Sequence, residues 1–255
     1  MNRKPPIEVR RLLRNEVGFG CPVPDCSNPY LEWHHFDPPW REHQHHDPEG
    51  MIALCSAHHP QADAGAFTPE QLRSFKLKGR DRMVEVSGKF NWLRNSLLAV
   101  VGGNFYYETL TIFQVQGLPV IWLRRDEEDY LLLNIRMIST SREERLVLED
   151  NFWIIKGTLS DFECPPSGKL IHARYANGDE LRIEYFELNA KSDAEKRFPN
   201  SVDERWSIIK FPITVVEVHH QIGGTPYGFG PHWTRLPGFH IEGCFSAYSG
   251  CAISM

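Results

Sequence analysis

The sequence lacks any long hydrophobic run. Its longest aliphatic stretch, LLAVV at residues 97–101, is far shorter than the roughly 18 residues needed to span a bilayer. The N-terminus is basic, but no apolar stretch follows it, and this pattern does not predict a signal peptide. We therefore expect a cytoplasmic protein with reduced thiols and no membrane partner.

The sequence also lacks an excess of positive charge. Its formal net charge is −5, and residues 1–80 are neutral, with ten basic and ten acidic side chains. The global charge therefore does not indicate nucleic-acid binding. Arg10, Arg11 and Arg14 form one local basic group. They belong either to a solvated helix face or to a substrate-binding surface, and we keep them as candidate substrate-binding residues.

The six cysteines are distributed unevenly along the chain. Of six cysteines, Cys21, Cys26 and Cys55 lie in the first part of the chain, together with seven of the twelve histidines. A disulfide framework is not expected in a protein that is not exported. Cysteine and histidine at short spacing in such a chain indicate a metal site.

The first eighty residues contain short elements of both types. A helix is predicted over residues 6–18, a strand over 30–36 and a helix over 56–65. A further helix begins at Thr68, where Thr can cap, Pro69 occupies the first helical position and Gln71 stands at the capping-box position. The charged stretch KLKGRDR, residues 76–82, is the candidate linker.

From about residue 90 the pattern changes to short alternating segments separated by Gly, Asp, Asn or Pro. Predicted strands are LTIFQVQ, PVIWLR, YLLLNIR, RLVLEDN, KLIHARY, ELRIEYF, WSIIKF and TVVEVHH. The fold class is thus α+β. A small zinc-stabilised module at residues 1–80 precedes a β-rich domain at 90–255, which is a sandwich, a barrel or a solenoid.

Two short-spaced pairs predict a closed zinc site. Cys21 and Cys26 form a CxxxxC pair, and about thirty residues later Cys55 and His58 form a CxxH pair. Thiolate and imidazole are the ligands that Zn²⁺ prefers, and four of them complete a tetrahedral structural site. Such a site would help a segment with few large apolar residues to fold.

A second set of polar residues lies between and after these pairs. His34 and His35 adjoin on the predicted strand, while His59 and Asp63 are four residues apart on the next helix and share one face. One strand histidine can then bind a metal while the other faces a water molecule. By contrast, the loop REHQHHDPEG at residues 41–50, with three more histidines, indicates a solvated surface or a loop that faces the substrate.

The run GFGCPVPDC…LEWHHFDP…MIALCSAHHPQAD resembles HNH nucleases of the ββα-metal group, in particular those with a CxxxxC…HH…LCxxHHxxxD pattern. The resemblance covers about residues 10–78. It implies that His34, His59 and Asp63 bind a catalytic divalent cation and that His35 is the general base. The chain departs from the pattern at Gly50, where such nucleases usually carry an Asn that braces the loop holding the base.

These features lead to a functional hypothesis with two alternatives. The leading hypothesis is an endonuclease that hydrolyses phosphodiester bonds in DNA, using a structural Zn²⁺ and one catalytic Mg²⁺, Mn²⁺, Ni²⁺ or Zn²⁺. The β-rich part would recognise a target, a protein partner or a second copy of the chain. The first alternative is a zinc-stabilised binding module with little or no cleavage activity. The second is a component of a defence or mobile-element complex.

Overall fold

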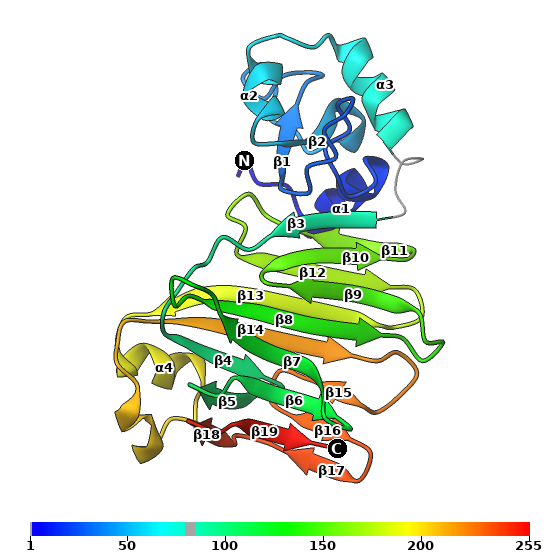
Figure 1. Ribbon diagram of the computed structural model, residues 1–255. Helices are drawn as coiled ribbons and strands as arrows, with labels where there is room; N and C mark the ends of the chain where they lie inside the picture. The colour runs from blue at the N-terminus through cyan, green and yellow to red at the C-terminus, as the bar shows by residue number, and fades with distance from the viewer. Residues whose placement is uncertain (1, 80–84) are drawn as a thin grey trace. The chain divides into compact units, whose positions relative to one another are not determined.

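The computed structural model describes residues 2–79 and 85–255, and Figure 1 shows its helices and strands. The chain is mixed α+β with mostly strands, and this confirms the predicted class at that level. It forms two compact units, Met1–Gly88 with Ile154–Tyr175, and Lys89–Trp153 with Ala176–Met255. The segment 154–175, which the strand pattern assigned to the β-rich part, therefore belongs to the first unit. None of the helices in the described ranges is long and apolar enough to cross a membrane.

The first unit holds all but one of the α-helices among the described residues. Its elements are α1 (Ile7–Glu16), β1 (Leu31–His35), the 3-10 helix η1 (Pro48–Gly50), β2 (Met51–Cys55), α2 (His58–Asp63), α3 (Pro69–Gly79), most of β3 (Glu85–Lys89), most of β10 (Phe152–Lys156), β11 (Leu159–Glu163) and β12 (Leu170–Tyr175). The helices predicted at residues 6–18, 56–65 and from Thr68 are therefore present. The strand predicted at 30–36 is β1.

Helix α3 begins with the capping box that its sequence predicts. The backbone N–H of Gln71 donates to the Thr68 hydroxyl at 3.3 Å, and the Gln71 side chain accepts from the Thr68 N–H at 2.8 Å. These bonds satisfy two donors that the helix start would otherwise leave free. Leu72 is buried, and Phe75 packs beside it on the core of this unit.

Strands β1 and β2 are antiparallel, and the register places Leu31 opposite Cys55 and His35 opposite Met51. All five residues of β2 are buried, and they form the centre of a core with Leu13 and Val17 from the α1 segment. Helix α2 follows β2 after two residues. This order of strand, strand and helix positions the histidines of β1 beside those of α2.

The predicted linker at residues 76–82 is wrong in its first half. Lys76 to Gly79 form the last turn of α3, and Lys76 is buried, with its ammonium 3.0 Å from Glu16 and 2.7 Å from the Pro48 carbonyl oxygen. An ammonium with two close acceptors can be buried at low cost. The rest of the predicted linker, Arg80 to Arg82, lies outside the described residues.

The second unit is almost entirely β. Its elements are β4 (Leu97–Val101), β5 (Asn104–Tyr107), β6 (Thr111–Val115), β7 (Leu118–Arg125), β8 (Leu131–Ile138), β9 (Glu144–Glu149), β13 (Glu180–Leu188), α4 (Lys191–Arg197), the 3-10 helix η3 (Glu204–Ile208), β14 (Ile213–Gln221), β15 (Gly228–Phe229), β16 (Thr234–Leu236), β17 (Phe239–Ile241), β18 (Phe245–Ala247) and β19 (Cys251–Ser254). Strands β19-β6-β7-β8-β9 are neighbours in one sheet. Strands β13-β14-β15-β16-β17 are neighbours in a second sheet, in which β4 also pairs with β14.

Side chains join the two sheets of this unit. The rings of Phe113 in β6 and Phe229 in β15 lie 5.5 Å apart, and the Tyr185 hydroxyl of β13 lies 3.4 Å from Oδ1 of Asn151. Asn151 follows β9 and is fully buried, and the same Oδ1 accepts the N–H of Leu133 in β8. Aromatic packing and one buried amide thus hold this core together.

One predicted strand of this unit is wrong. WSIIKF, residues 206–211, falls partly in η3, where the Asp203 carboxylate accepts the Arg205 N–H at the helix start. Trp206 and Ile209 are buried, whereas Ile208 is 40% exposed. In a strand, Trp206 and Ile208 would share a face, so the observed burial at a spacing of three fits a helical turn instead.

Candidate functional site

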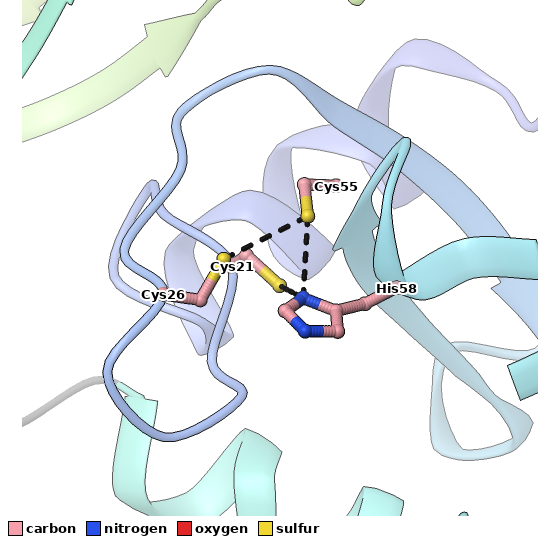
Figure 2. A group of neighbouring side chains, drawn as sticks. All are labelled: Cys21, Cys26, Cys55 and His58. Atoms are coloured by element: carbon pink, nitrogen blue, oxygen red, sulfur yellow. Dashed lines mark hydrogen bonds between the residues drawn. The ribbon is translucent and has the colours of Figure 1, made fainter. Parts of the chain in front are cut away.

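The four predicted zinc ligands lie together in the first unit. Cys21 and Cys26 come from the loop after α1, Cys55 ends β2, and His58 begins α2 (Figure 2). The His58 Nδ1 lies 3.4 Å from the Cys21 sulfur and 3.3 Å from the Cys55 sulfur, and the sulfurs of Cys26 and Cys55 are 3.7 Å apart. One ligand atom of each residue lies within 4.8 Å of the other three.

These distances fit the edges of a tetrahedral metal site. With Zn–S bonds of about 2.3 Å and Zn–N bonds of about 2.0 Å, tetrahedral edges are about 3.8 Å between sulfurs and about 3.5 Å between sulfur and nitrogen. Burial raises the pKa of the thiols of Cys21 and Cys26, so that thiolates here need a cation beside them. The donor set and its spacing are therefore those of a site that can hold a metal ion such as zinc.

A second group that can hold a metal comprises His34 of β1 with His59 and Asp63 of α2. One ligand atom of each lies within 4.8 Å of the others. The Nδ1 of His34 is 3.2 Å from Asp63 Oδ1, and the Nε2 of His59 is 4.0 Å from Asp63 Oδ2. Both of these nitrogens are buried without a hydrogen-bond partner. Two orphaned imidazole nitrogens beside a carboxylate have the chemistry of a divalent-cation site.

Glu32 is a functional candidate that the sequence reasoning missed. Its Oε2 lies 2.9 Å from the Nδ1 of His59. Because a carboxylate only accepts, the hydrogen of this contact is on Nδ1, and in a neutral ring the Nε2 that faces Asp63 is then the acceptor nitrogen. Glu32 and His34 are two residues apart in β1 and share one face of the strand, so strand alternation was a signal that could have identified it.

His35 lies at the end of β1 and is buried among aromatic rings. Its ring centroid is 4.6 Å from Trp40, 5.3 Å from His45 and 5.9 Å from His46. Neither ring nitrogen has a hydrogen-bond partner in good geometry. Burial lowers the pKa of His35 to about 4, and the backbone carbonyl of His45 opposes part of this effect. The ring is therefore neutral at pH 7 and able to accept a proton.

A cavity of about 440 Å³ is shared by His35 and by His34 and Asp63 of the second group that can hold a metal. It is lined by His34, His35 and Asp63 together with Arg3, Phe36, Pro39, Trp40, Arg41, Ala62, Gly65, Phe67, Pro69 and Leu72. His34 and His35 are buried residues of this lining. Arg3 and Arg41 are exposed cations beside them, and their charge suits an anionic substrate.

The loop between β1 and η1 is only partly solvated. His43 is exposed, whereas His46 is half-buried and stacks on Trp40 at 5.5 Å. His45 is buried, and its ring nitrogens lie 2.9 Å from the Pro38 carbonyl oxygen and 3.1 Å from the Asp47 N–H. The interpretation of this loop as solvated surface is therefore wrong for His45. A loop position carries no periodic signal that predicts burial.

The three candidate substrate-binding arginines contact carboxylates of β11. Arg14 is 2% exposed and forms a bidentate pair with Asp161 at 2.8–3.0 Å. Arg11 lies 3.3 Å from the same carboxylate, and Arg10 lies 3.6 Å from Glu163. The alternative of a solvated helix face is thus wrong for Arg14. A substrate role for the three arginines stays a prediction.

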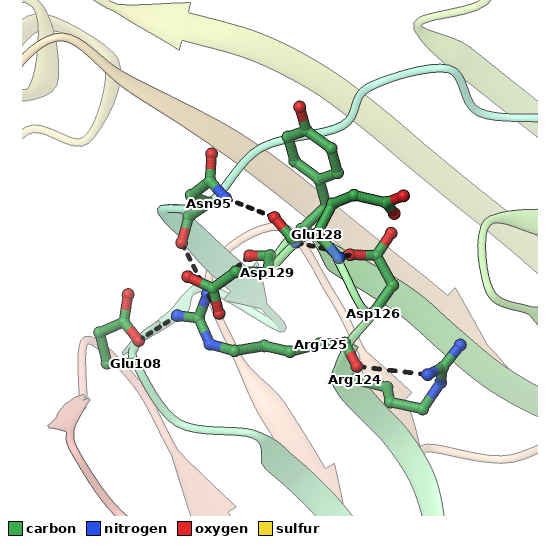
Figure 3. Close-up of polar contacts among 8 residues, drawn as sticks. Asn95, Glu108, Arg124, Arg125, Asp126, Glu128 and Asp129 are labelled. Atoms are coloured by element: carbon green, nitrogen blue, oxygen red, sulfur yellow. Dashed lines mark hydrogen bonds and ion pairs between the residues drawn. The ribbon is translucent and has the colours of Figure 1, made fainter.

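The second unit has its own polar cluster at the turn between β7 and β8 (Figure 3). The Arg125 guanidinium donates to Glu108 Oε2 at 2.7 Å and to the carbonyl oxygens of Asn95 and Asp129, both at 2.9 Å. Asp126 accepts the N–H groups of Glu128 and Tyr130. These hydrogen bonds stabilise the turn between β7 and β8, and this structural role accounts for the cluster.

The two metal-capable groups described above are the only such sets of three or more close ligands found in the part of the chain that the structure describes. Comparison of the chain with protein families, with curated proteins and with solved structures finds no match. The geometry of the first unit is therefore the basis for assigning a function.

Proposed function

We propose that this protein is a metal-dependent endonuclease of the HNH type that hydrolyses phosphodiester bonds in DNA. One observation carries the proposal. A buried neutral imidazole, His35, shares a cavity with His34 and Asp63, and His34 and His59 point unpartnered nitrogens at the Asp63 carboxylate. A general base beside a divalent-cation site is what phosphodiester hydrolysis requires.

Two metals have separate roles in this proposal. Cys21, Cys26, Cys55 and His58 hold a structural Zn²⁺ that fixes the loop after α1 to the end of β2. His34, His59 and Asp63 hold the catalytic divalent cation, which is Mg²⁺, Mn²⁺, Ni²⁺ or Zn²⁺. When bound, that cation stabilises the negative charge that develops on the scissile phosphate.

The side chains of this chain then supply the proton transfer and the positioning. The neutral His35 ring takes a proton from a water molecule, whose oxygen attacks the phosphorus in line with the leaving 3′ oxygen. A P–O bond to water forms, the P–O3′ bond breaks, and the leaving oxygen takes up a proton. Glu32 fixes the tautomer of His59 through the 2.9 Å contact at Nδ1.

The site has one base and one cation group, so each catalytic event cuts one strand. Nicking of duplex DNA is therefore the first product that we expect. A double-strand break would need two visits or two chains, and the β-rich unit is where we place contact with a second copy or a protein partner.

The test is conversion of supercoiled plasmid to the relaxed form by purified protein with Mg²⁺ or Mn²⁺, and with EDTA as the metal control. Wild type should relax the plasmid, and His35→Ala should slow this by about 10²–10⁴-fold, the usual contribution of a general base. His240→Ala is the matched control because His240 is an exposed histidine of the second unit.

Equal rates of plasmid conversion by wild type and His35→Ala would show that His35 is not the general base. No conversion with any metal, together with DNA binding by the same preparation, would favour the alternative of a zinc-stabilised binding module. The departure at Gly50 is the observation behind that alternative, because glycine has no side chain to brace the loop. Cleavage that appears only with a co-purifying protein would favour a component of a larger complex.

A further inference from the structure

The loop from Phe36 to Gly50 folds back on the end of β1, where His35 lies. Backbone groups close it. The Gly50 carbonyl oxygen accepts the N–H groups of Phe36 at 2.9 Å and Asp37 at 3.2 Å. The two residues that follow His35 are therefore tied to the residue that precedes β2.

The His45 ring adds a second connection within this loop. Its Nδ1 accepts the Asp47 N–H at 3.1 Å, so the hydrogen is on Nε2, which donates to the Pro38 carbonyl oxygen at 2.9 Å. Both nitrogens of a buried ring are thus satisfied by backbone atoms on opposite sides of the loop. This ring meets the His35 ring edge to face at a centroid distance of 5.3 Å.

Residue 50 has to be glycine for this arrangement to form. A Cβ at position 50 would overlap the Asp37 carbonyl oxygen and lie 2.9 Å from Cε1 of His45. Any side chain here would therefore push apart the loop backbone and the His45 ring. The absence of a side chain at position 50 is what lets His45 occupy this place.

We infer that His45 is the positioning residue for His35. His35 has no hydrogen-bond partner of its own in good geometry, and three rings surround it. Of these, His45 is buried and bonded to backbone through both nitrogens, whereas Trp40 and His46 are half-buried and stack on each other. The inference rests on the proposed nuclease function, and it gives the backbone of Gly50 and the ring of His45 the bracing role in this loop.

The experiment measures kcat and KM for plasmid nicking by three variants. His45→Phe keeps the ring and removes both hydrogen bonds, so kcat should fall about 10–100-fold while KM and zinc content stay unchanged. His45→Gln can donate to Pro38 and accept from Asp47, and it should recover most of the lost rate. His240→Phe, the matched control at an exposed histidine of the second unit, should keep the wild-type kcat.

A combined variant separates positioning from general stability. In the His35→Ala background, His45→Phe should cause no further loss of the residual rate, because the group that it positions is gone. The inference is overturned if His45→Phe keeps kcat within about twofold of wild type, if His45→Gln restores nothing, or if the losses of the two single variants multiply.

A readout independent of cleavage distinguishes this inference from the proposed function. Nitrogen-15 NMR of the histidine rings should show His45 with its hydrogen on Nε2. His45→Phe should shift the His35 ring signals, and His240→Phe, in the second unit, should leave them unchanged. If the NMR results are as expected but no plasmid is converted, the nuclease proposal is wrong and the contact between His45 and His35 is still supported. Unchanged His35 signals in His45→Phe would sink the positioning role even in an active enzyme.

Discussion

The Oε2 of Glu32 lies 2.9 Å from the Nδ1 of His59, and this contact connects a residue of β1 to a residue of α2. A carboxylate behind a ligating histidine fixes the ring orientation and raises the basicity of the other nitrogen. His34 stands on the same strand face as Glu32 and also meets His59, with ring centroids 5.4 Å apart. Glu32 and His34, at alternate positions of one strand, thus both contact His59 of the second group that can hold a metal.

Replacing Glu32 should weaken this group and leave the cysteine site intact. We expect Glu32→Ala to lower the affinity for Mn²⁺ by about 10–100-fold, because the His59 ring loses its orienting partner. Calorimetric titration with Mn²⁺ measures this, and zinc analysis should still give one zinc per chain. Glu42→Ala, at an exposed carboxylate of the neighbouring loop, should bind Mn²⁺ like wild type. Equal affinity in both variants would contradict the role of Glu32.

Loss of one buried thiol should abolish zinc binding. Cys55→Ser removes a ligand that is 0% exposed, and we expect zinc content to fall well below one per chain. The first unit should then lose most of its stability, because metal binding to such sites is worth on the order of 10 kcal/mol. Elemental analysis and circular dichroism before and after chelation measure both effects. Cys244→Ser, at an exposed thiol of the other unit, is the control. Full zinc occupancy in Cys55→Ser would refute the site.

Arg14 should matter for stability. Arg14→Met removes the shortest, bidentate partner of the buried Asp161 carboxylate, which keeps the more exposed Arg11 and Arg174. We expect the free energy of unfolding to fall by about 2 kcal/mol, because the charge-assisted hydrogen bonds of Arg14 are lost while the remaining arginines still compensate the charge. Urea unfolding measures it. Arg41→Met, at a side chain that is 86% exposed, should change stability by less than about 0.5 kcal/mol. Similar small effects for both arginines would show that the buried pair is not stabilising.

Stability should depend on pH through His220 of β14. Burial lowers the pKa of His220 to about 4, below its unfolded value of about 6.5. The unfolded chain therefore takes up a proton before the folded chain does, and the stability present above pH 6.5 is lost as the pH falls toward 4. His220→Phe removes this contribution, so its midpoint of thermal unfolding should fall less than that of wild type between pH 7 and pH 5. The exposed His240→Phe should follow wild type. Parallel pH curves for His220→Phe and wild type would rule out this linkage.

The local features of this protein could be predicted from the sequence. The capping box at Thr68 and Gln71, the short cysteine and histidine spacings and the alternation of most β-rich segments all depend on residues close together in the chain. Such patterns are readable because helix and strand periodicity and metal-ligand spacing are local geometric rules. Strand periodicity gave a wrong prediction at residues 206–211, because the spacing of the apolar residues there also fits a 3-10 turn, in which every third residue lies on one face.

Contacts between residues far apart in the chain could not be predicted and are seen only in the folded structure. Arg14 is buried against Asp161, which is 147 residues away in the chain. His45 is buried within a loop whose sequence is mostly polar. Glu32 is also aligned with His59 across the β1 and α2 packing. These contacts depend on strand register and on how the chain closes its loops. Both are set by burial and backbone hydrogen bonding over the whole unit, and no short window of sequence contains that information.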